Sequence, residues 1–386
     1  MSAWVLRGAR VWDGLVTSPV EADVVVDGAI IGAVGSSTLA PQTIDVSGAT
    51  IVPGLIEAHT HLCFNAQRDW RQVYDADSPA RMMVRMAGNA QSMLRAGITT
   101  VRDLGAPTAL AVELRDALRA GLATGPDLLV AGAPITTTGG HCYFIGGEAD
   151  GALEVRKRVR EFVRSGVDWI KIMATGGNMT PGTNTLAAQF RLEELQAAVE
   201  EAHRLGRKVT AHCHGTEGIR VAVEARVDGI EHCSFNAPGA IEYVPDLIAA
   251  IAGTGIVVSP TVSVASGQWA DTERLGQRGR VLRGLLDQGA RMLMSTDCGI
   301  PGVPHDALAG GMKVLRDIAG LSDVETLKLA TSRSAELLGL GDRGTIEAGK
   351  RADLLVVDGD PTRDLAALND VRLVVVAGTP LWPSRA

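Results

Sequence analysis

The sequence predicts an α/β protein: a (β/α)8 TIM barrel with a small β-sandwich domain built from both chain ends. Three observations lead to this prediction. Residues 1–53 and 343–386 contain short β-branched runs separated by Gly and Asp-Gly turns. Residues 54–342 instead alternate between short apolar runs and longer stretches with helical spacing. The apolar runs number eight, which favours a closed barrel over the alternative of a doubly wound open sheet.

The predicted barrel strands follow one another along the middle of the chain. They are GLIEAHTHL from Gly54, ITTVRDLG from Ile98, DLLVAGA from Asp127, DWIKIMA from Asp168, KVTAHCH from Lys208, GIEHCS from Gly229, IVVSPT from Ile256 and RMLMSTD from Arg291. Stretches such as RLEELQAAVEEAHRLG, from Arg191, separate them and repeat apolar residues at helical spacing. We therefore expect residues 54–342 to form the barrel, and residues 1–53 with 343–386 to form the sandwich domain.

Composition limits the classes of partner. The chain has 386 residues and a formal net charge of −7, and it lacks the Lys/Arg clusters typical of nucleic-acid binding. The longest near-apolar run, LIAAIAGTGIVV from Leu247, is too short to span a bilayer. The first residues lack the apolar core of a signal peptide. We expect a cytoplasmic protein with a small-molecule substrate and no nucleic-acid or membrane partner.

The five cysteines are an odd number in a long chain, which argues against a disulfide framework. Four of them directly follow a His or an Asp, so a zinc–thiolate cluster is one interpretation. The other interpretation is packing. Neighbours on a strand point to opposite faces, so a His that faces a site leaves the next Cys in the packing layer. We therefore expect buried free thiols that behave as small apolar residues.

Potential metal ligands recur at the carboxyl ends of the predicted strands, where barrel sites form. The set is His59, His61, Lys171, His212, His232 and Asp297. The spacing of His59 and His61 places both imidazoles on one face of their strand. The remaining members come from four other strands, and a chance gathering of these residue types at such positions is hard to credit.

This set of side chains suits divalent metal ions. Imidazole and carboxylate groups are typical ligands of zinc. Four histidines and an aspartate are too many for one catalytic zinc, but they suit two ions about 3.5–4 Å apart with a bridging hydroxide. As an ammonium, Lys171 is a poor ligand, so it would have to lose its charge or react with CO2 to give a carbamate. We expect two divalent metal ions as cofactors, with zinc as the expected metal.

The motifs VPGLIEAHTHL, AGITTVRDLG, KIMATGG, AHCHG, GIEHC and STDCG resemble the amidohydrolase superfamily, in particular its imidazolonepropionase-like and Xaa-Pro dipeptidase (prolidase-like) members. The terminal GTIEAGKRADLLVVDGDP resembles the β-sandwich end of the same superfamily, so the resemblance covers essentially the whole chain. It implies that His59, His61 and Asp297 hold the first metal, and that His212 and His232 hold the second.

The resemblance also implies that Lys171, as N6-carboxylysine, bridges the two metals. Imidazolonepropionases use one metal without such a lysine, so WIKIMATGG favours the binuclear, prolidase-like branch. The implied activity is hydrolysis of an amide or peptide C–N bond by a metal-bridging hydroxide, with Asp297 moving a proton from the nucleophile to the leaving amine. The implied protein is also a homo-oligomer.

A dipeptide or an N-acyl amino acid is the expected substrate. Two alternatives stay open on the same residues: hydrolysis of a cyclic imidazolone-like amide, and hydrolysis of a carbamate or an ester. A more distant alternative is a non-catalytic scaffold of the same fold. Such relatives typically lack the metal ligands, so a metal assay separates the scaffold from the enzyme.

Substrate contacts are predicted around this site. His141 lies in the Gly-rich TTTGGHCYF loop, and in the resembling family this histidine contacts substrate near the polarised carbonyl, so it joins Asp297 and Lys171 as a catalytic candidate. His214 shares the strand face of His212. Eight aromatic residues, Tyr143 among them, fall in predicted loops on the active face and indicate an apolar or aromatic substrate group. They are Phe64, Trp70, Tyr74, Tyr143, Phe144, Phe190, Phe235 and Trp269. For a substrate carboxylate, the candidate partners are Arg68, Arg71 and Arg102.

Overall fold

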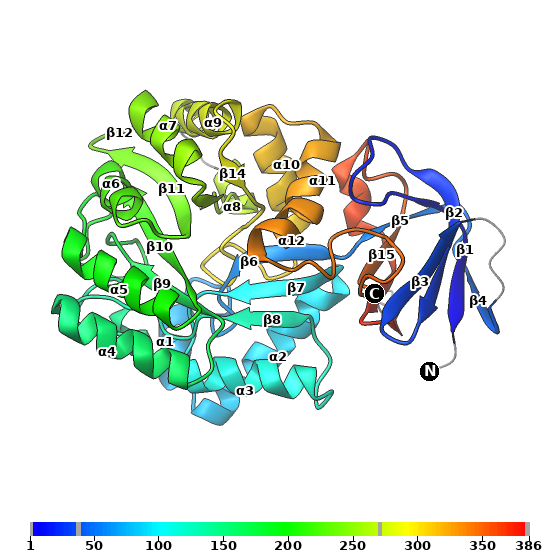
Figure 1. Ribbon diagram of the computed structural model, residues 1–386, viewed down its shortest axis with the longest axis horizontal. Helices are drawn as coiled ribbons and strands as arrows, with labels where there is room; N and C mark the ends of the chain where they lie inside the picture. Colours follow the sequence, from blue (N-terminus) through cyan, green and yellow to red (C-terminus); the bar gives the residue numbers. More distant parts are fainter. Residues whose placement is uncertain (1–2, 36–39, 269–271, 383–386) are drawn as a thin grey trace.

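The computed structural model describes residues 3–35, 40–268 and 272–382. It is a mixed α/β structure in which a large body of parallel strands and helices adjoins a sheet built from both chain ends (Figure 1). The α/β class predicted from the sequence is therefore confirmed. Trp269, one of the aromatic candidates, lies outside the described residues.

The chain-end sheet interleaves N-terminal and C-terminal strands. Its strands are β1 (Trp4–Val11), β2 (Val20–Asp27), β3 (Ile30–Gly35), β4 (Gln42–Asp45), β5 (Ala49–Pro53), β15 (Leu354–Asp358), β16 (Val371–Val376) and β17 (Thr379–Leu381). They pair in the order β17-β16-β15-β5-β1-β2-β3, and β4 pairs with β1. The two ends of the chain meet where β15 runs antiparallel to β5. Leu6, Val24, Ile51 and Val356 belong to the buried apolar core of this sheet.

A second set of strands is parallel. They are β6 (Leu55–Thr60), β7 (Ile98–Asp103), β8 (Asp127–Val130), β9 (Trp169–Met173), β10 (Lys208–Gly215), β11 (Gly229–Ala237), β13 (Val257–Ser259) and β14 (Arg291–Met292). Each of the eight apolar runs identified in the sequence coincides with one of these strands, as predicted, although β10 and β11 extend beyond their runs. The short β12 (Ala240–Ile241) turns back against β11.

Pairings at the sheet edges connect these parallel strands into a continuous circuit. Strands β6, β7 and β8 form one sheet, and β9, β10, β11, β13 and β14 form another. Beyond β8, Ile135 bridges in parallel to Ile172 of β9. Beyond β14, Cys298 bridges in parallel to Thr60 of β6. Each strand or its extension thus has a parallel neighbour on both sides, and the carboxyl ends gather at one end of the circuit.

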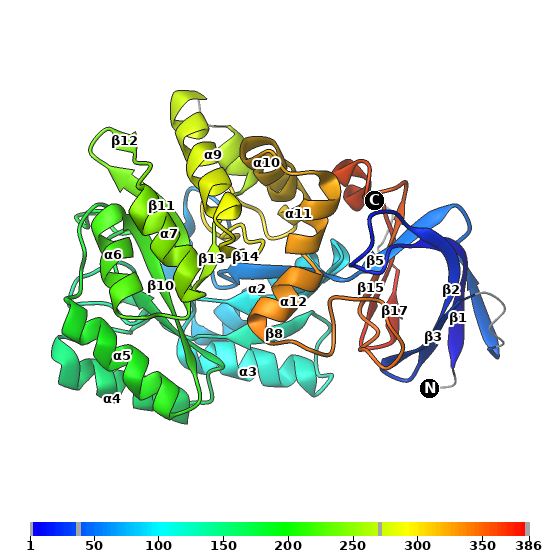
Figure 2. The ribbon, with the colours of Figure 1, turned by 45° about the horizontal axis from the view of Figure 1, so that its top comes forward.

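Helices cover the outside of the parallel strands (Figure 2). They are α1 (Trp70–Ala76), α2 (Pro79–Arg95), α3 (Thr108–Arg119), α4 (Gly151–Arg164), α5 (Leu192–Arg204), α6 (Thr216–Glu224), α7 (Pro245–Thr254), α8 (Val264–Gly267), α9 (Thr272–Asp287), α10 (Leu308–Ala319), α11 (Asp323–Leu329) and α12 (Ser332–Leu338), with short 3-10 helices η1 (Tyr143–Ile145) and η2 (Leu365–Asn369). Helix α2 begins where the Ser78 side chain accepts from the Arg81 amide and Pro79 takes the first position. It buries Met86 and Met93 against the strands.

All five cysteines are buried and free, which agrees with the packing interpretation. Within the described ranges, no helix is both long and apolar enough to cross a membrane.

The chain-end sheet is joined to the parallel strands by polar and apolar contacts. Arg343, in the segment between α12 and β15, donates to Thr100 within β7 and to Asp127 of β8, the latter 2.8 Å away. Gly97, in the turn between α2 and β7, lies against Leu355 of β15. Its φ of +85° is in the left-handed region, and a Cβ there would lie 2.6 Å from Leu355 Cδ2. Both the backbone and the space at this contact therefore require glycine.

Replacing Gly97 by alanine should lower the free energy of unfolding by about 3 kcal/mol, because left-handed strain and overpacking add together. Gly121→Ala is the matched control. Gly121 has a φ of +72° but nothing within 4 Å of the added methyl group, so only the backbone cost of about 1 kcal/mol applies. Denaturant unfolding of both variants measures the difference, and equal losses would contradict the contact between Gly97 and Leu355.

Candidate metal centre

Three ligand atoms converge where β6 ends. The imidazoles of His59 and His61 are buried, and their Nε2 atoms lie 3.3 Å apart. Asp297, which follows β14, places its Oδ1 atom 3.3 Å from His59 Nε2 and 3.1 Å from His61 Nε2. These three side chains thus form a compact group that could hold a metal ion.

The outer nitrogen of each imidazole has its own partner. His59 Nδ1 lies 2.8 Å from Glu231 Oε2, and His61 Nδ1 lies 3.0 Å from the Gly105 carbonyl oxygen. Burial alone would raise the pKa of Glu231. Arg102 and His59 lower it by a larger amount, so the pKa of Glu231 lies well below the usual range of a glutamate. Both acceptors hold the ring protons on Nδ1, which leaves a lone pair on each Nε2.

This arrangement provides a test of whether a cation fits. The Nε2 lone pairs of His59 and His61 face each other. Neither neutral imidazole can donate a hydrogen bond to Asp297 from Nε2 while its proton stays on Nδ1. Asp297 Oδ1 is buried and accepts no hydrogen bond of proper geometry from the described residues. Three acceptors that converge without a donor are what a divalent cation satisfies, so the donor set fits a metal ion.

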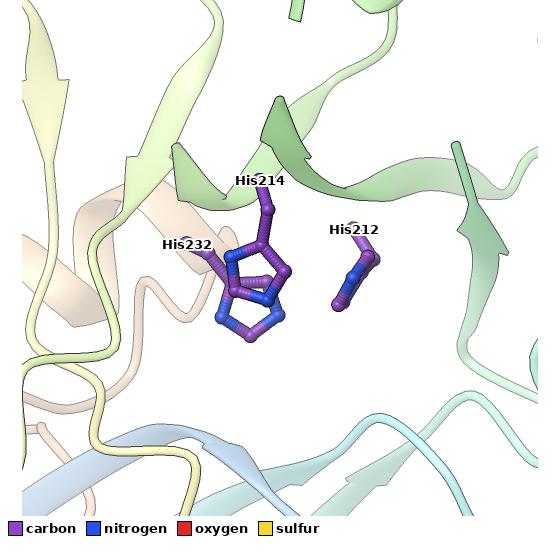
Figure 3. Close-up of side chains that lie close together, drawn as sticks. All are labelled: His212, His214 and His232. Atoms are coloured by element: carbon purple, nitrogen blue, oxygen red, sulfur yellow. The ribbon is translucent and has the colours of Figure 1, made fainter. Parts of the chain in front are cut away.

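The second group consists of His212 and His214 on β10 and His232 on β11 (Figure 3). The rings of His214 and His232 are stacked with centroids 4.4 Å apart, and the His212 ring lies 4.4 Å from that of His232. His232 Nδ1 pairs with Thr261 Oγ1, and His212 Nε2 pairs with the Gly176 carbonyl oxygen. His212 therefore presents Nδ1 to the site, whereas His232 presents Nε2.

His214 lies closer to the second group than the sequence indicated. We expected it to contact substrate, but its ligand atom lies within 4.8 Å of those of His212 and His232. A sequence signal for this placement was present: His212 and His214 repeat the H-x-H spacing of His59 and His61. The Nδ1 atom of His214 pairs with Ser234 Oγ at 2.9 Å.

The two groups share one cavity of about 260 Å³, into which Lys171 of β9 also projects. The His59 and His232 rings, one from each group, are 5.3 Å apart. Burial lowers the pKa of Lys171, and within the described ranges no carboxylate lies within 4 Å of its amine. A buried amine with a lowered pKa is poised to lose its proton, and the uncharged form is the one that reacts with CO2.

Burial also keeps most of the imidazoles neutral. It lowers the pKa of His59 and of His214 to about 4, and the pKa values of His212 and His232 fall well below their usual range. His61 is the exception, because the neighbouring Asp297 outweighs burial and raises its pKa. Neutral imidazole is the form that binds metal, so the histidines other than His61 are ready to bind an ion near neutral pH without losing a proton.

Two of the candidate ligands lie on a backbone that L-residues rarely adopt. The φ angle is +66° at His232 and +62° at Asp297. Cys233 and Thr261, beside His232, also have positive φ. Left-handed backbone at a non-glycine residue costs energy and is concentrated at functional sites, where the surroundings hold it in place.

His141 lies in the same cavity and is buried. Its Nδ1 atom is 3.1 Å from Thr180 Oγ1, which also accepts from the Cys142 amide. Burial lowers the pKa of His141 to about 3, so the ring is neutral. A methyl group on Gly177 would lie 2.3 Å from His141 Nε2, so the glycine leaves room for this ring.

Five of the aromatic candidates pack on one another instead of lining the cavity, and Phe190 and Phe235 lie in the buried apolar core. Phe64, Trp70, Tyr74 and Phe144 form a cluster with ring centroids 5.0–6.4 Å apart. Tyr143 is 39% exposed and contacts Phe144. No Phe, Tyr or Trp of the described residues lines the cavity, whose apolar wall includes Met173, Met179, Ile300 and Val303.

The predicted arginines also lie elsewhere. Arg102 is buried beneath the site and donates to Glu231, Arg71 pairs with Asp75, and Arg68 is exposed. Instead, Arg274 and Arg278 of α9 line the cavity. Sequence reasoning missed both, because a helix of ordinary composition carries no signal for which of its faces a cavity meets.

Comparison with known proteins decides the family. The sequence profile of the amidohydrolase family matches residues 50–381 of this chain. The chain belongs to the amidohydrolase family. The prediction of a hydrolase is thereby confirmed.

Several relatives share most of the chain length. Ochratoxinase from Aspergillus niger is 29% identical over 86% of this chain and 74% of its own. Imidazolonepropionase from Deinococcus radiodurans is 26% identical over 97% of this chain and 95% of its own. Among solved structures, a Xaa-Pro dipeptidase with bound methionine in the active site has a TM-score of 0.88 at 26% identity, covering 99% of this chain and 100% of that chain.

Substitution of Gly105 by alanine tests the support of His61. The added methyl group would lie 2.7 Å from the His61 ring, so the imidazole has to move. We expect metal affinity to fall by about 10- to 100-fold, as for other losses of a ligand's support. Metal analysis after dialysis against a weak chelator measures it, and Gly88→Ala, where nothing lies within 4 Å, is the control. Unchanged metal content in a folded Gly105→Ala protein would count against His61 as a ligand.

Proposed function

We propose that the protein is a binuclear metal-dependent amidohydrolase that cleaves the amide bond of a small substrate, such as a dipeptide or an N-acyl amino acid. One observation carries the proposal: two groups of ligand atoms and a buried lysine share a single cavity at the carboxyl ends of the strands. Family membership supports the same conclusion.

The fold proposal follows the strand pairings. We propose that the circuit of parallel strands is a closed (β/α)8 barrel formed by residues 54–342. Its support is the pair of edge bridges at Ile135 and Cys298. Residues 1–53 and 343–386 would form the β-sandwich domain, supported by the separate apolar core of the chain-end sheet.

The metal assignments are proposed residue by residue. His59, His61 and Asp297 would hold the first ion, and His212 and His232 the second. Lys171, as N6-carboxylysine, would bridge them, which its burial and lowered pKa support. His214 lies close enough to the second group to act as a further ligand or to contact substrate.

When bound, two such ions supply a Lewis acid for the substrate carbonyl and lower the pKa of water. The chain itself supplies proton transfer and orientation. Burial raises the pKa of Asp297, but His59 and His61 lower it by more, so its carboxylate is ionised and able to accept a proton. It can then pass that proton to the leaving amine. Thr180 can donate to His141 Nδ1, which leaves His141 with an Nε2 proton for the substrate carbonyl.

The choice among amides is guided by the relatives and by Lys171. Similarity to a Xaa-Pro dipeptidase and to ochratoxinase supports a linear amide. Similarity to imidazolonepropionases keeps a cyclic amide as the second candidate. The aliphatic wall supports an apolar group on the substrate. Zinc as the native metal, the homo-oligomer and the cytoplasmic location stay predictions.

Metal content tests the binuclear site. We expect about two divalent ions per chain in the parent protein, as two-metal hydrolases carry. The Lys171→Ala variant should bind clearly fewer, because it lacks the bridge. Elemental analysis of purified protein gives both numbers. Lys208→Ala, an exposed lysine on β10, should leave metal content unchanged. About one ion in both the parent and Lys171→Ala would favour the mononuclear, cyclic-amide branch.

Loss of the proposed proton carrier tests the chemistry. Asp297→Asn should lower kcat/KM for N-acyl amino acids or dipeptides by about 100- to 10,000-fold, because the amide cannot take the proton. Asp306→Asn, an exposed aspartate after the same strand, should retain activity. The metal content of Asp297→Asn, measured in parallel, separates a lost ligand from a lost base. An Asp297→Asn enzyme with parental activity would exclude the proposed role.

A further inference from the structure

A buried arginine forms part of the wall of the cavity that also holds the candidate metal ligands of β6. Arg278 lies on α9, is 5% exposed and lines the cavity. Its Nη1 atom donates to the Cys233 carbonyl at 2.6 Å, and its Nη2 atom donates to the carbonyls of His232 and Pro260, the latter at 2.9 Å. Three backbone carbonyls thus fix the guanidinium in one orientation.

Its charge has no anionic partner in the described part of the chain. No carboxylate of residues 3–35, 40–268 or 272–382 lies within 4 Å of Arg278, unlike the buried Arg102, which pairs with Glu231. Burial lowers the pKa of Arg278 to about 10, which still leaves it charged at neutral pH. A buried cation without a counter-charge is costly, so proteins that keep one generally use it.

The guanidinium also has donors left over. Arginine carries five N–H groups, and the three bonds to carbonyls engage both Nη2 hydrogens and one Nη1 hydrogen. The Nε–H and the second Nη1–H are not used by these bonds. They point to different sides of the guanidinium, so each can donate singly to an oxygen of a bound carboxylate.

The rest of the cavity favours an anion. Among the described residues that line it, Asp297 is the only acidic side chain, and it belongs to the first ligand group. Arg274 lies one turn before Arg278 on the same helix, donates to Asn236 and lines the same cavity. Lys171 and any bound metal add further positive charge. The lining also includes apolar side chains, Met173 and Val303 among them.

We infer that Arg278, with Arg274 beside it, forms a carboxylate-binding wall, so that the substrate is an amide whose amine part carries a free carboxylate. The acyl part would then lie against the apolar wall. This inference rests on the proposed amide hydrolysis and narrows its substrate class. It also makes Arg278 the residue that separates such substrates from neutral amides and carbamates.

The competing explanation is that Arg278 serves only as a clamp. His232, Cys233 and Thr261 have left-handed backbone, and the guanidinium holds the carbonyls of His232, Cys233 and Pro260. A clamp alone would affect every substrate equally. A carboxylate partner would affect only substrates that carry the carboxylate, so a ratio of substrates separates the two roles.

The experiment compares two matched substrates on metal-loaded enzyme. N-acetyl amino acids are paired with the corresponding N-acetyl amino alcohols, which keep the scissile amide but lack the carboxylate. In the parent enzyme we expect kcat/KM to favour the acid by about 30-fold or more, the size of a lost charge partner. In Arg278→Gln that preference should largely disappear, whatever the overall rate. In Arg278→Lys part of it should return.

Arg283→Gln is the control, because Arg283 lies on the same helix and pairs with Asp287 at the surface. It should keep both the rate and the preference of the parent. An Arg278→Gln enzyme that loses activity equally on acids and alcohols would show that Arg278 is a clamp only, and the inference would be overturned.

A binding measurement keeps this inference separate from the proposed function. Calorimetry compares free amino acids, the products of such a reaction, with the matching amino alcohols on parent and Arg278→Gln proteins. Parent protein that prefers the acid by binding yet hydrolyses no amide would support the carboxylate wall and contradict amide hydrolysis. Parent protein that hydrolyses amides without any preference for the acid, or that neither binds nor cleaves an acid, overturns the inference.

Discussion

The buried carboxylate of Glu231 is the interaction on which the rest of the site depends. From β11 it accepts from His59 on β6, from Arg102 on β7 and from Thr210 on β10. Arg102 in turn donates to the Ala58 carbonyl and lies over the Trp169 ring of β9 at 4.7 Å. A buried charge is tolerated only when donors satisfy it. Here the donors come from neighbouring strands. The buried charge of Glu231 is therefore satisfied only when these strands keep their observed arrangement.

A second buried carboxylate extends this control to the other ligands. Glu57 accepts from the His59 amide, and from both the amide and the hydroxyl of Thr296. Burial raises the pKa of Glu57 to about 7, despite these bonds. The carboxylate of Glu57 therefore ties the backbone amide of His59 to the residue before Asp297, although the two candidate ligands lie 238 positions apart in sequence. Residues beneath the site thus set the positions of residues within it.

The strands, and most of the side chains that gather at the candidate site, could be predicted from the sequence because both obey short-range rules. A strand has a fixed period, and a barrel gathers strand ends, so His59, His61, His212 and His232 could be placed without coordinates. Arg102 was a candidate partner for a substrate carboxylate. The alternation of side chains along β7 instead turns it inward below the candidate ligands, where it donates to Glu231. The aromatic side chains pack against each other, not against the cavity. Arg278 depended on which face of α9 meets the strands, and packing between distant segments decides that.

The geometry of the first ligand group also links metal to stability. Glu231 and the Gly105 carbonyl hold the protons of His59 and His61 on Nδ1, so two lone pairs face each other at 3.3 Å beside the Asp297 carboxylate. While both imidazoles are neutral and keep their outer partners, no proton is available to these three atoms. Folding the chain without a cation therefore carries an electrostatic cost at this point, and the left-handed backbone at Asp297 adds to it. A divalent ion bound here would remove the repulsion only in the folded state, so metal binding would also stabilise the fold. The convergence of these three acceptor atoms destabilises the fold in the absence of an ion. The same convergence favours the binding of a cation, which accepts their electron pairs.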